Sequence, residues 1–412
     1  MATKEKIKSG YKPSRFGSIP IDWEISFLKD VVDDKRTIRY GIVQPGVFDE
    51  NGRYLVRGQD YSFGWVEPKQ LFKVSDEIEI KYKNARIKTG DIILTIVGAG
   101  TGTVAIVPEW LDGANITQTT ARIAINPAKA DTNFCYYFLN SEKGKKLTYE
   151  NIKGGAQPGL NCGDIDYFEL PYPPLPEQRT IAKLLITWDK AINSLENIIV
   201  QKEIRKKWLI QMLLTGKKRL KGFTLDWRTC PLVDIANFLN GKAYKQEELL
   251  DEGKYKVLRV GNFFTNSNWY YSDLELEDDK YVSEGDLMYA WSASFGPRFW
   301  KGAKTIYHYH IWKVIPSEFI TKQFLFYFLV FDTDKIFNNK QGGTMFHITK
   351  GDMEKRKIKL PNIEEQTAIA NVLQATDREL QSLKNKLEKL KEQKKGLMQI
   401  LLTGKKRITI KK

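Results

Sequence analysis

The sequence predicts an α+β protein with two β-rich domains in a pseudo-twofold arrangement, joined by two long helices that form an antiparallel coiled coil. Three observations support this fold class. The chain contains an internal repeat, each copy of the repeat ends in a long apolar pattern with helical spacing, and the basic excess lies in two short segments. A length of 412 residues is sufficient for two or three domains.

The composition is that of a folded protein, with 42% hydrophobic, 12% aromatic and 28% charged residues. The chain has no run of 18 apolar residues and its first residues lack an apolar signal core, so we expect neither a membrane span nor secretion. The three cysteines, Cys135, Cys162 and Cys230, are odd in number and widely spaced. They do not form a disulfide framework and predict a reducing, cytoplasmic location.

The net charge of +15 is distributed unevenly along the chain. Residues 1–177 contain 23 basic and 23 acidic side chains, and residues 222–364 contain 19 of each. Residues 178–221 contain 11 basic and 3 acidic side chains, and residues 365–412 contain 12 and 5. A strongly basic chain favours a phosphate-bearing partner such as nucleic acid. Because each large block is neutral, binding there would depend on local patches of side chains.

A shift of 188 residues aligns two parts of the chain. Residues 154–219 and 342–407 share 25 of 66 residues without a gap, and residues 213–219 return unchanged as 401–407. Chance does not produce such agreement, and it indicates a duplicated unit. Upstream of these segments the similarity continues with changing shifts, as expected for insertions and deletions in loops. Each half is therefore a divergent block followed by a helical block.

The repeat defines four predicted segments. They are a first β-rich domain at 1–172, a first helical spacer at 173–221, a second β-rich domain at 222–360, and a second helical spacer with a basic tail at 361–412. Prolines at 173, 174 and 176 are typical of the boundary between a strand and a helix. Gly216 and Gly404 follow the last apolar residues and are typical helix C-terminal stops.

Apolar residues in each spacer are separated alternately by three and four positions, with a few polar interruptions. This spacing is typical of a coiled coil, and the matched positions predict that the two helices pair with each other. Two amphipathic helices that pack on separate domain cores are the alternative. The candidate interface residues are Ile181, Leu185, Trp188, Ile192, Leu195, Ile199, Leu209, Ile369, Leu373, Leu380, Leu383, Leu387, Leu390 and Leu397.

The β-rich blocks contain several recognisable elements. Residues 91–97 and 103–107 are apolar strands, and the glycine-rich turn 98–102 between them predicts a hairpin. Residues 134–139 and 324–329 are short apolar runs that fit either a buried helix or a buried strand, and the pattern does not decide between them.

No catalytic or cofactor motif is present in the sequence. The Gly-Lys pairs lack the earlier glycine of a P-loop, and a strand rather than a helix follows the glycines at 98, 100 and 102. The sequence also lacks a Gly-x-Ser-x-Gly elbow and the Asn-Pro-Pro-aromatic or Asp-Pro-Pro-Tyr tetrapeptide of adenine methyltransferases. His308 and His310 alternate on an expected strand, but no third metal ligand lies nearby in sequence. We therefore predict a chain that is not an enzyme and binds no metal or cofactor.

Both β-rich blocks instead contain side chains that suit nucleic-acid readout, namely hydrogen-bonding groups that read base edges and phosphates, and aromatic rings that stack. Each of these side chains, taken alone, could also lie on the solvent-exposed surface without contacting DNA. In the first block, Gln44 and Tyr61 accompany the candidates Arg36, Arg39, Tyr40, Arg57, Gln59, Thr101, Gln118, Thr119 and Gln157. In the second block the candidates are Lys242, Tyr244, Lys245, Arg259, Asn262, Trp291, Ser292, Ser294, Arg298, His308, His310, Thr344 and His347.

Several of these motifs together resemble the specificity subunit of type I restriction–modification systems. They are Leu-Pro-Glu-Gln at 175–178 leading into a helix that ends Leu-Leu-Thr-Gly-Lys-Lys-Arg at 213–219, and the second copy at 360–361, 365–366 and 401–407. Residues 90–94, the turn 98–102 and the segment 154–159 also resemble the recognition domains of this family. The second copy departs from the pattern at 362–364 and at 292–296.

The resemblance implies a non-catalytic DNA-binding subunit in which each target-recognition domain reads one half of a split, asymmetric site. The implied partners are double-stranded DNA, two methyltransferase subunits and, in complete systems, two ATP-dependent translocase–nuclease subunits. S-adenosylmethionine, ATP and Mg would be used by those partners and not by this chain. Three alternatives remain open: the recognition subunit of a system that cuts on both sides of its site, a coiled-coil scaffold that binds no DNA, and a self-contained nuclease.

The predicted helices also suggest how the half-sites are spaced. Residues 178–214 would span about 55 Å, which corresponds to roughly 16 base pairs of DNA. Half-sites centred about 10 base pairs apart would face the same side of the duplex. The basic residues Lys206, Lys207, Lys394 and Lys395 either solvate the outside of the helices or contact phosphates and partner subunits.

Overall fold

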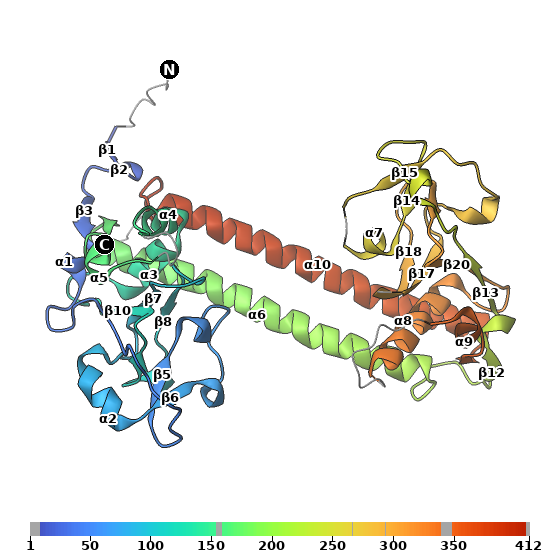
Figure 1. Ribbon diagram of the computed structural model, residues 1–412, viewed down its shortest axis with the longest axis horizontal. Helices are drawn as coiled ribbons and strands as arrows, with labels where there is room; N and C mark the ends of the chain where they lie inside the picture. The colour runs from blue at the N-terminus through green and yellow to red at the C-terminus, as the bar shows by residue number, and fades with distance from the viewer. Residues whose placement is uncertain (1–8, 154–158, 266, 293, 339–347, 409–412) are drawn as a thin grey trace. The chain divides into compact units, whose positions relative to one another are not determined.

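The structure is a computed structural model that describes residues 9–153, 159–265, 267–292, 294–338 and 348–408. The chain divides into two compact units, each containing part of both long helices (Figure 1). Unit 1 comprises Met1–Leu195 and Lys386–Lys412, and unit 2 comprises Glu196–Asn385. Both combine strands and helices, as the predicted α+β class requires.

In the described residues of unit 1, the strands form four small sheets, ordered β1-β2, β4-β10-β7-β8, β6-β5-β9 and β11-β3. Their strands are β1 (Tyr11–Ser14), β2 (Gly17–Pro20), β3 (Glu24–Phe27), β4 (Arg39–Tyr40), β5 (Arg53–Val56), β6 (Phe72–Val74), β7 (Ile92–Thr95), β8 (Val104–Ile106), β9 (Asn115–Ile116), β10 (Thr120–Ile123) and β11 (Glu169–Tyr172). The short helices are α1 (Leu28–Val31), α2 (Asp76–Glu79), α3 (Thr132–Asn140), α4 (Glu142–Glu150) and α5 (Cys162–Asp166).

The part of unit 2 that the structure describes forms three sheets, ordered β13-β20-β17-β18, β15-β14-β19-β16 and β12-β21. Their strands are β12 (Arg228–Pro231), β13 (Ala236–Asn240), β14 (Tyr255–Leu258), β15 (Tyr270–Ser272), β16 (Tyr281–Val282), β17 (Leu287–Ser292), β18 (Ser294–Phe299), β19 (Thr305–Tyr307), β20 (Ile311–Pro316) and β21 (Lys357–Leu360). The helices are α7 (Val260–Phe264), α8 (Lys322–Asn338) and α9 (Lys350–Glu354).

The two units repeat one topology. The sheet β4-β10-β7-β8 corresponds to β13-β20-β17-β18, and β6-β5-β9 corresponds to β15-β14-β19. The centre of each of the latter sheets is a parallel pair, Val56 beside Ile116 in unit 1 and Leu258 beside Tyr307 in unit 2. The duplication that is plain only from residue 154 onward in the sequence therefore extends through both β-rich blocks.

The predicted hairpin is confirmed, because β7 and β8 pair antiparallel. The two undecided apolar runs are helical and lie in α3 and α8, where Phe134, Phe138, Phe324 and Leu325 are buried in the cores. The predicted strand at 308–310 is wrong. These residues connect β19 to β20, which belong to different sheets, so the chain must turn there.

The two long helices are α6 (Leu175–Leu214) and α10 (Ile363–Leu401) (Figure 1). In unit 1, Lys394 of α10 forms an ion pair with Asp189 of α6. In unit 2, Lys206 of α6 pairs with Asp377 of α10, and Lys202 pairs with Glu379. In unit 2 the α10 partner moves from Glu379 to Asp377 as the α6 residue moves from Lys202 to Lys206, so the paired segments of this unit are antiparallel.

The fourteen candidate interface residues are all buried or half-buried. Ile181 and Leu185 lie in the core of unit 1, and Ile369 and Leu373 lie in the core of unit 2. Each core also contains the last turn of the other long helix, with Leu401 in unit 1 and Leu213 in unit 2. The two helices therefore share a core within each unit and do not pack on the separate cores that the alternative interpretation expected. The other ten candidates are also buried or half-buried, namely Trp188, Ile192, Leu195, Ile199, Leu209, Leu380, Leu383, Leu387, Leu390 and Leu397.

The repeated Gln178 and Gln366 join each long helix to a domain helix. The Gln178 side-chain oxygen accepts a hydrogen bond from the backbone N–H of Asp131, at the start of α3, and its amide donates to Pro173 O. Gln366 accepts from the N–H of Thr321, before α8, and donates to Pro361 O. Each glutamine satisfies buried backbone groups, which explains why both copies retain it.

The glycines that end the long helices adopt left-handed conformations, with φ of 69° at Gly216 and 67° at Gly404. A Cβ at Gly404 would lie 2.3 Å from Pro20 Cδ, whereas at Gly216 the nearest atom is 3.4 Å away, on Trp227. Both substitutions to alanine incur the left-handed penalty of about 1 kcal/mol, and Gly404→Ala also forces the backbone near Pro20 to move.

We therefore expect Gly404→Ala to lower the melting temperature of unit 1 clearly more than Gly216→Ala lowers that of unit 2. Thermal unfolding of the full chain, followed separately for each unit, checks this. Equal shifts would contradict the close contact with Pro20.

Candidate nucleic-acid interface

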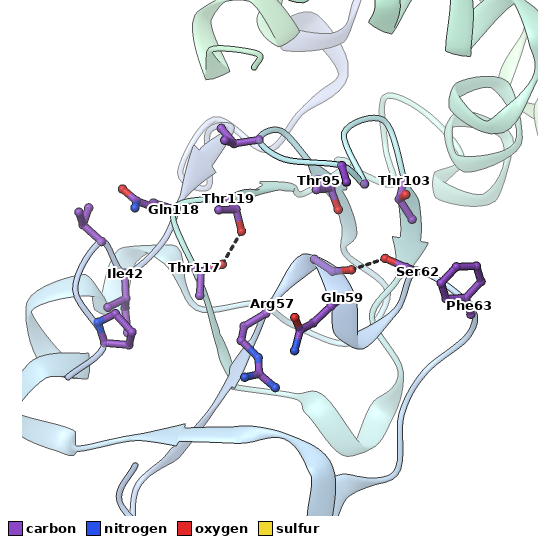
Figure 2. Close-up of a pocket in the computed structure, with 16 residues that line it drawn as sticks. Ile42, Arg57, Gln59, Ser62, Phe63, Thr95, Thr103, Thr117, Gln118 and Thr119 are labelled. Atoms are coloured by element: carbon purple, nitrogen blue, oxygen red, sulfur yellow. Dashed lines mark hydrogen bonds between the residues drawn. The ribbon is translucent and has the colours of Figure 1, made fainter. Parts of the chain in front are cut away.

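Unit 1 contains a cavity of about 720 Å³ between its sheets (Figure 2). Four predicted site residues, Arg57, Gln59, Gln118 and Thr119, line it. The turn that follows β7 also contributes to the wall. The other lining residues are Ile42, Val43, Pro45, Gly58, Ser62, Phe63, Thr95, Val97, Ala99, Gly100, Thr103 and Thr117.

The fold positions these side chains at the carboxyl ends of two parallel strands. Arg57 directly follows β5, and residues 117–119 directly follow β9. Gly41 allows its own segment of the chain to pass close to β9, because a Cβ at this position would lie 1.8 Å from the backbone oxygen of Ile116. The carboxyl ends of parallel strands are a common place for ligand sites, because the loops that leave them converge there.

Polar groups of the cavity are held by local hydrogen bonds. The hydroxyls of Thr117 and Thr119 are 2.8 Å apart, and the Ser62 hydroxyl donates to Gly58 O (Figure 2). Gln59 and Gln118 are exposed, and their amides can donate and accept hydrogen bonds at a base edge. The cavity thus combines fixed hydroxyls with accessible amide groups.

Unit 2 contains a cavity of about 450 Å³ that also gathers four predicted residues, Arg259, Asn262, His308 and His310. Its other lining residues are Val260, Gly261, Asn268, Tyr270 and Tyr309. Arg259 directly follows β14, and residues 308–310 directly follow β19.

The two cavities occupy equivalent positions in the repeated fold. Arg57 and Arg259 both precede a short helix, with nearly identical backbone angles of −109°, 156° and −108°, 163°. Ile42 bridges Thr117 in parallel, and Lys242 bridges His308 in the same way. The arginine is thus common to both cavities, whereas Thr-Gln-Thr at 117–119 is replaced by His-Tyr-His at 308–310.

Electrostatics differ between the cavities as well. Burial, and secondarily the proximity of His310 and Arg259, lowers the pKa of His308 to about 4, so this imidazole is neutral at neutral pH. Burial likewise raises the pKa of Tyr244, whose ring stacks on His308. His308 therefore offers hydrogen bonds and stacking rather than positive charge.

Other candidates of unit 1 lie outside its cavity. Arg36 forms a bidentate ion pair with Asp91, at 2.8 and 2.6 Å, and acts inside the protein. Arg39 and Tyr40 are exposed on β4. Thr101 lies in the glycine-rich turn and donates to Gly98 O.

In unit 2, the Lys242 ammonium is paired with Glu248, and Lys245 is exposed. Trp291 donates to Tyr309 O and Arg298 lies over the Phe264 ring, so both support the loops around the cavity. Ser292 is buried and Ser294 is exposed. Gln157, Thr344 and His347 fall outside the described residues.

Sequence reasoning missed Ser62 and Phe63 in unit 1 and Tyr309 and Tyr270 in unit 2. Phe63 is fully exposed at the cavity, where its ring is available for stacking. Tyr309 could have been found, because it lies between two selected histidines. Ser62 and Phe63 had no such signal, since the turn after β5 was not recognised.

In the part of the chain that the structure describes, no three His, Cys, Asp or Glu side chains gather as a metal site would require. None of the described helices combines the length and apolar character needed to cross a bilayer.

Comparison with known proteins identifies the family. The model of the type I restriction modification DNA specificity domain matches twice, at residues 20–205 and 224–392. The chain therefore belongs to this family. It is 27% identical, over 97% of both chains, to a type I restriction enzyme specificity subunit of Methanocaldococcus jannaschii. It is 31% identical to the EcoBI specificity subunit of Escherichia coli, over 51% of this chain and 44% of that one.

Solved structures show the same fold. One is a chain from a type I R-M system studied for complex assembly and conformational transition, with a TM-score of 0.62, 18% identity and coverage of 94% of this chain and 99% of that one. Another is the S subunit from M. genitalium, with a TM-score of 0.54, 17% identity and coverage of 94% and 97%. At these identities the likeness concerns the fold alone.

Proposed function

We propose that this chain is the DNA sequence-specificity subunit of a type I restriction–modification complex and that each repeated domain reads one half of a bipartite site. The observation that carries this proposal is the equivalence of the two cavities. Both lie at the ends of a parallel strand pair, and an arginine that directly follows one of these strands lines each of them. The loops at 117–119 and 308–310, which also line the cavities, differ in sequence. One scaffold with two different reading surfaces suits an asymmetric split site.

We further propose that α6 and α10 form a continuous antiparallel coiled coil that joins the recognition domains in a pseudo-twofold arrangement. The domains would comprise residues 1–172 and 222–360, with spacers at 173–221 and 361–412. Repeated ion pairs support this, since Asp189 with Lys394 and Asp377 with Lys206 are equivalent under the shift of 188. The helix length would then set the separation of the half-sites.

In this proposal the chain is not catalytic and binds no cofactor itself. It recruits two methyltransferase subunits, which would use S-adenosylmethionine. In a complete system it also recruits two translocase–nuclease subunits, which would use ATP and Mg. Because His308 is neutral at neutral pH and Arg36 is paired within the protein, DNA affinity would come from a small number of local contacts.

Single-molecule sequencing of adenine methylation tests the proposed function. In the native host, deletion of this gene is expected to abolish methylation at one bipartite, asymmetric motif, and the wild-type gene is expected to restore it. The control is a host that lacks only the translocase–nuclease subunit, in which the motif should persist. Methylation of the same motif by the methyltransferase alone would contradict the proposal.

A further inference from the structure

The arginine common to both cavities has different neighbours in the two units. In unit 1 the Asp60 carboxylate is 2% exposed and accepts three hydrogen bonds from Arg57. The donors are the backbone N–H at 2.8 Å, Nε at 3.2 Å and Nη2 at 3.0 Å. A carboxylate so bound fixes both the backbone and the guanidinium of the same residue.

This pairing occupies one edge of the guanidinium and leaves the other available. Asp60 takes Nε and one hydrogen of Nη2, while Nη1 makes no hydrogen bond to any residue that the structure describes. Arg57 lines the cavity (Figure 2) and its side chain is about one third exposed. We take the Nη1–Nη2 edge, which Asp60 does not occupy, as the edge that would meet a base. Two parallel donors on that edge match O6 and N7 of guanine in the major groove.

The buried carboxylate of Asp60 also favours a base over a phosphate as the group that Arg57 would contact. Because Asp60 neutralises Arg57, the pair has little attraction for a phosphate, whose binding depends on net positive charge. A neutralised guanidinium with a fixed orientation retains its geometric selectivity, and geometry is what base reading requires.

Unit 2 provides the internal comparison. The residue three positions after Arg259 is Asn262, whose amide donates to Asn268 O. Arg259 is exposed. Its guanidinium lies over the Tyr270 ring at 5.1 Å, as that of Arg57 lies over the Phe72 ring at 5.9 Å, so the carboxylate is the difference between the two sites. The equivalent arginine therefore retains its positive charge and lacks the carboxylate that would orient it.

We propose that Arg57, held by Asp60, is a specificity-determining residue that reads one guanine in the half-site of the first domain. Arg57 would contact the base, and Asp60 is a positioning residue that acts through it. This inference rests on the proposed function, because it requires that the first domain reads DNA.

The test uses the complete methyltransferase complex with the variants Arg57→Ala, Arg57→Lys and Asp60→Asn. Methylation motifs are determined by sequencing after incubation with a random DNA library. Both Arg57 variants are expected to lose discrimination at one guanine of one half-site by about 10- to 100-fold, leaving the other half-site unchanged. Arg57→Lys keeps the charge, so the loss would report the bidentate geometry.

Asp60→Asn separates orientation from charge. It should weaken discrimination at the same guanine and also strengthen binding to non-cognate DNA, with the slope of log affinity against log salt steeper by about one. Arg259→Ala is the matched control and should leave the first half-site intact. Thermal unfolding of each variant confirms that the domain is folded.

An unchanged first half-site in both Arg57 variants would overturn the inference while leaving the proposed function intact. An equal loss of binding at every DNA sequence would also overturn it, because that pattern indicates a phosphate contact. If the wild-type complex methylates no bipartite motif, the proposed function fails and the inference fails with it.

Discussion

Replacing Glu177 with alanine is expected to destabilise unit 1 by about 2 kcal/mol. Glu177 is 1% exposed and accepts hydrogen bonds from Nε and Nη2 of Arg407 and from the indole N–H of Trp23. Truncation would leave the N–H of Trp23, a fully buried residue, without its partner. The contribution of the ion pair itself is reduced because the Arg407 side chain is 41% exposed.

Unit 2 repeats this arrangement. Glu365 accepts from Nε and Nη2 of Arg219 and from the indole N–H of Trp227, so Glu365→Ala should destabilise unit 2 and leave unit 1 unaffected. Thermal unfolding measures both effects, and Glu364→Ala, at an exposed neighbour, is the control. A shift for Glu364→Ala as large as that for Glu365→Ala would show that this contact is unimportant.

The second large effect is expected from reversing the charge of Lys394, which should destabilise unit 1 by about 1–2 kcal/mol. The Asp189 carboxylate accepts from the Lys394 ammonium and from the Tyr137 hydroxyl, the latter at 2.6 Å. Burial and this hydrogen bond raise the pKa of Tyr137. A glutamate at 394 would place a second carboxylate against Asp189, beside the buried ring of Tyr137.

The equivalent contact in unit 2 consists of Lys206, Asp377 and the Tyr327 hydroxyl, which is 2.7 Å from the carboxylate. Lys206→Glu should therefore act like Lys394→Glu but on unit 2, as followed by thermal unfolding. Lys207 is exposed beside it and is the matched control. If Lys207→Glu destabilises as much as Lys206→Glu, general charge on the helix rather than this contact would be responsible.

These contacts change the interpretation of the basic helices. Lys206 and Lys394 were expected to solvate the helices or to meet partners and phosphates, but they form ion pairs between α6 and α10. Lys395 pairs with Glu142 of α4. Of the four lysines considered, Lys207 is the one that remains suited to a test of partner or phosphate contact.

Local sequence patterns predict those elements whose structure depends on residues close together in the chain. The spacing of apolar residues identified both long helices, and the glycines at 216 and 404 marked their ends. The hairpin of β7 and β8 followed from alternation around a glycine-rich turn. In each case the period of the side chains reflects the geometry of the backbone.

The sequence identifies candidate site residues by their chemical type. Chemical type alone does not distinguish residues that line a cavity from residues that are paired inside the protein. Arg36 and Arg57 look alike in sequence, yet Arg36 is paired with Asp91, 55 residues away, and Arg57 lines a cavity. The loop 308–310 was taken for a strand because its alternation fits one, whereas the change from one sheet to another is a long-range feature.

The sequence by itself determined the duplication, the two long helices and the family resemblance, because repeats and helical periods are local or self-similar features. Tertiary structure alone decided which charges are used inside the protein and which face the cavities. Ion pairs such as Glu177 with Arg407 join residues 230 positions apart. Nothing in the spacing of residues along the chain specifies such a contact, since it depends on how strands and helices pack in three dimensions.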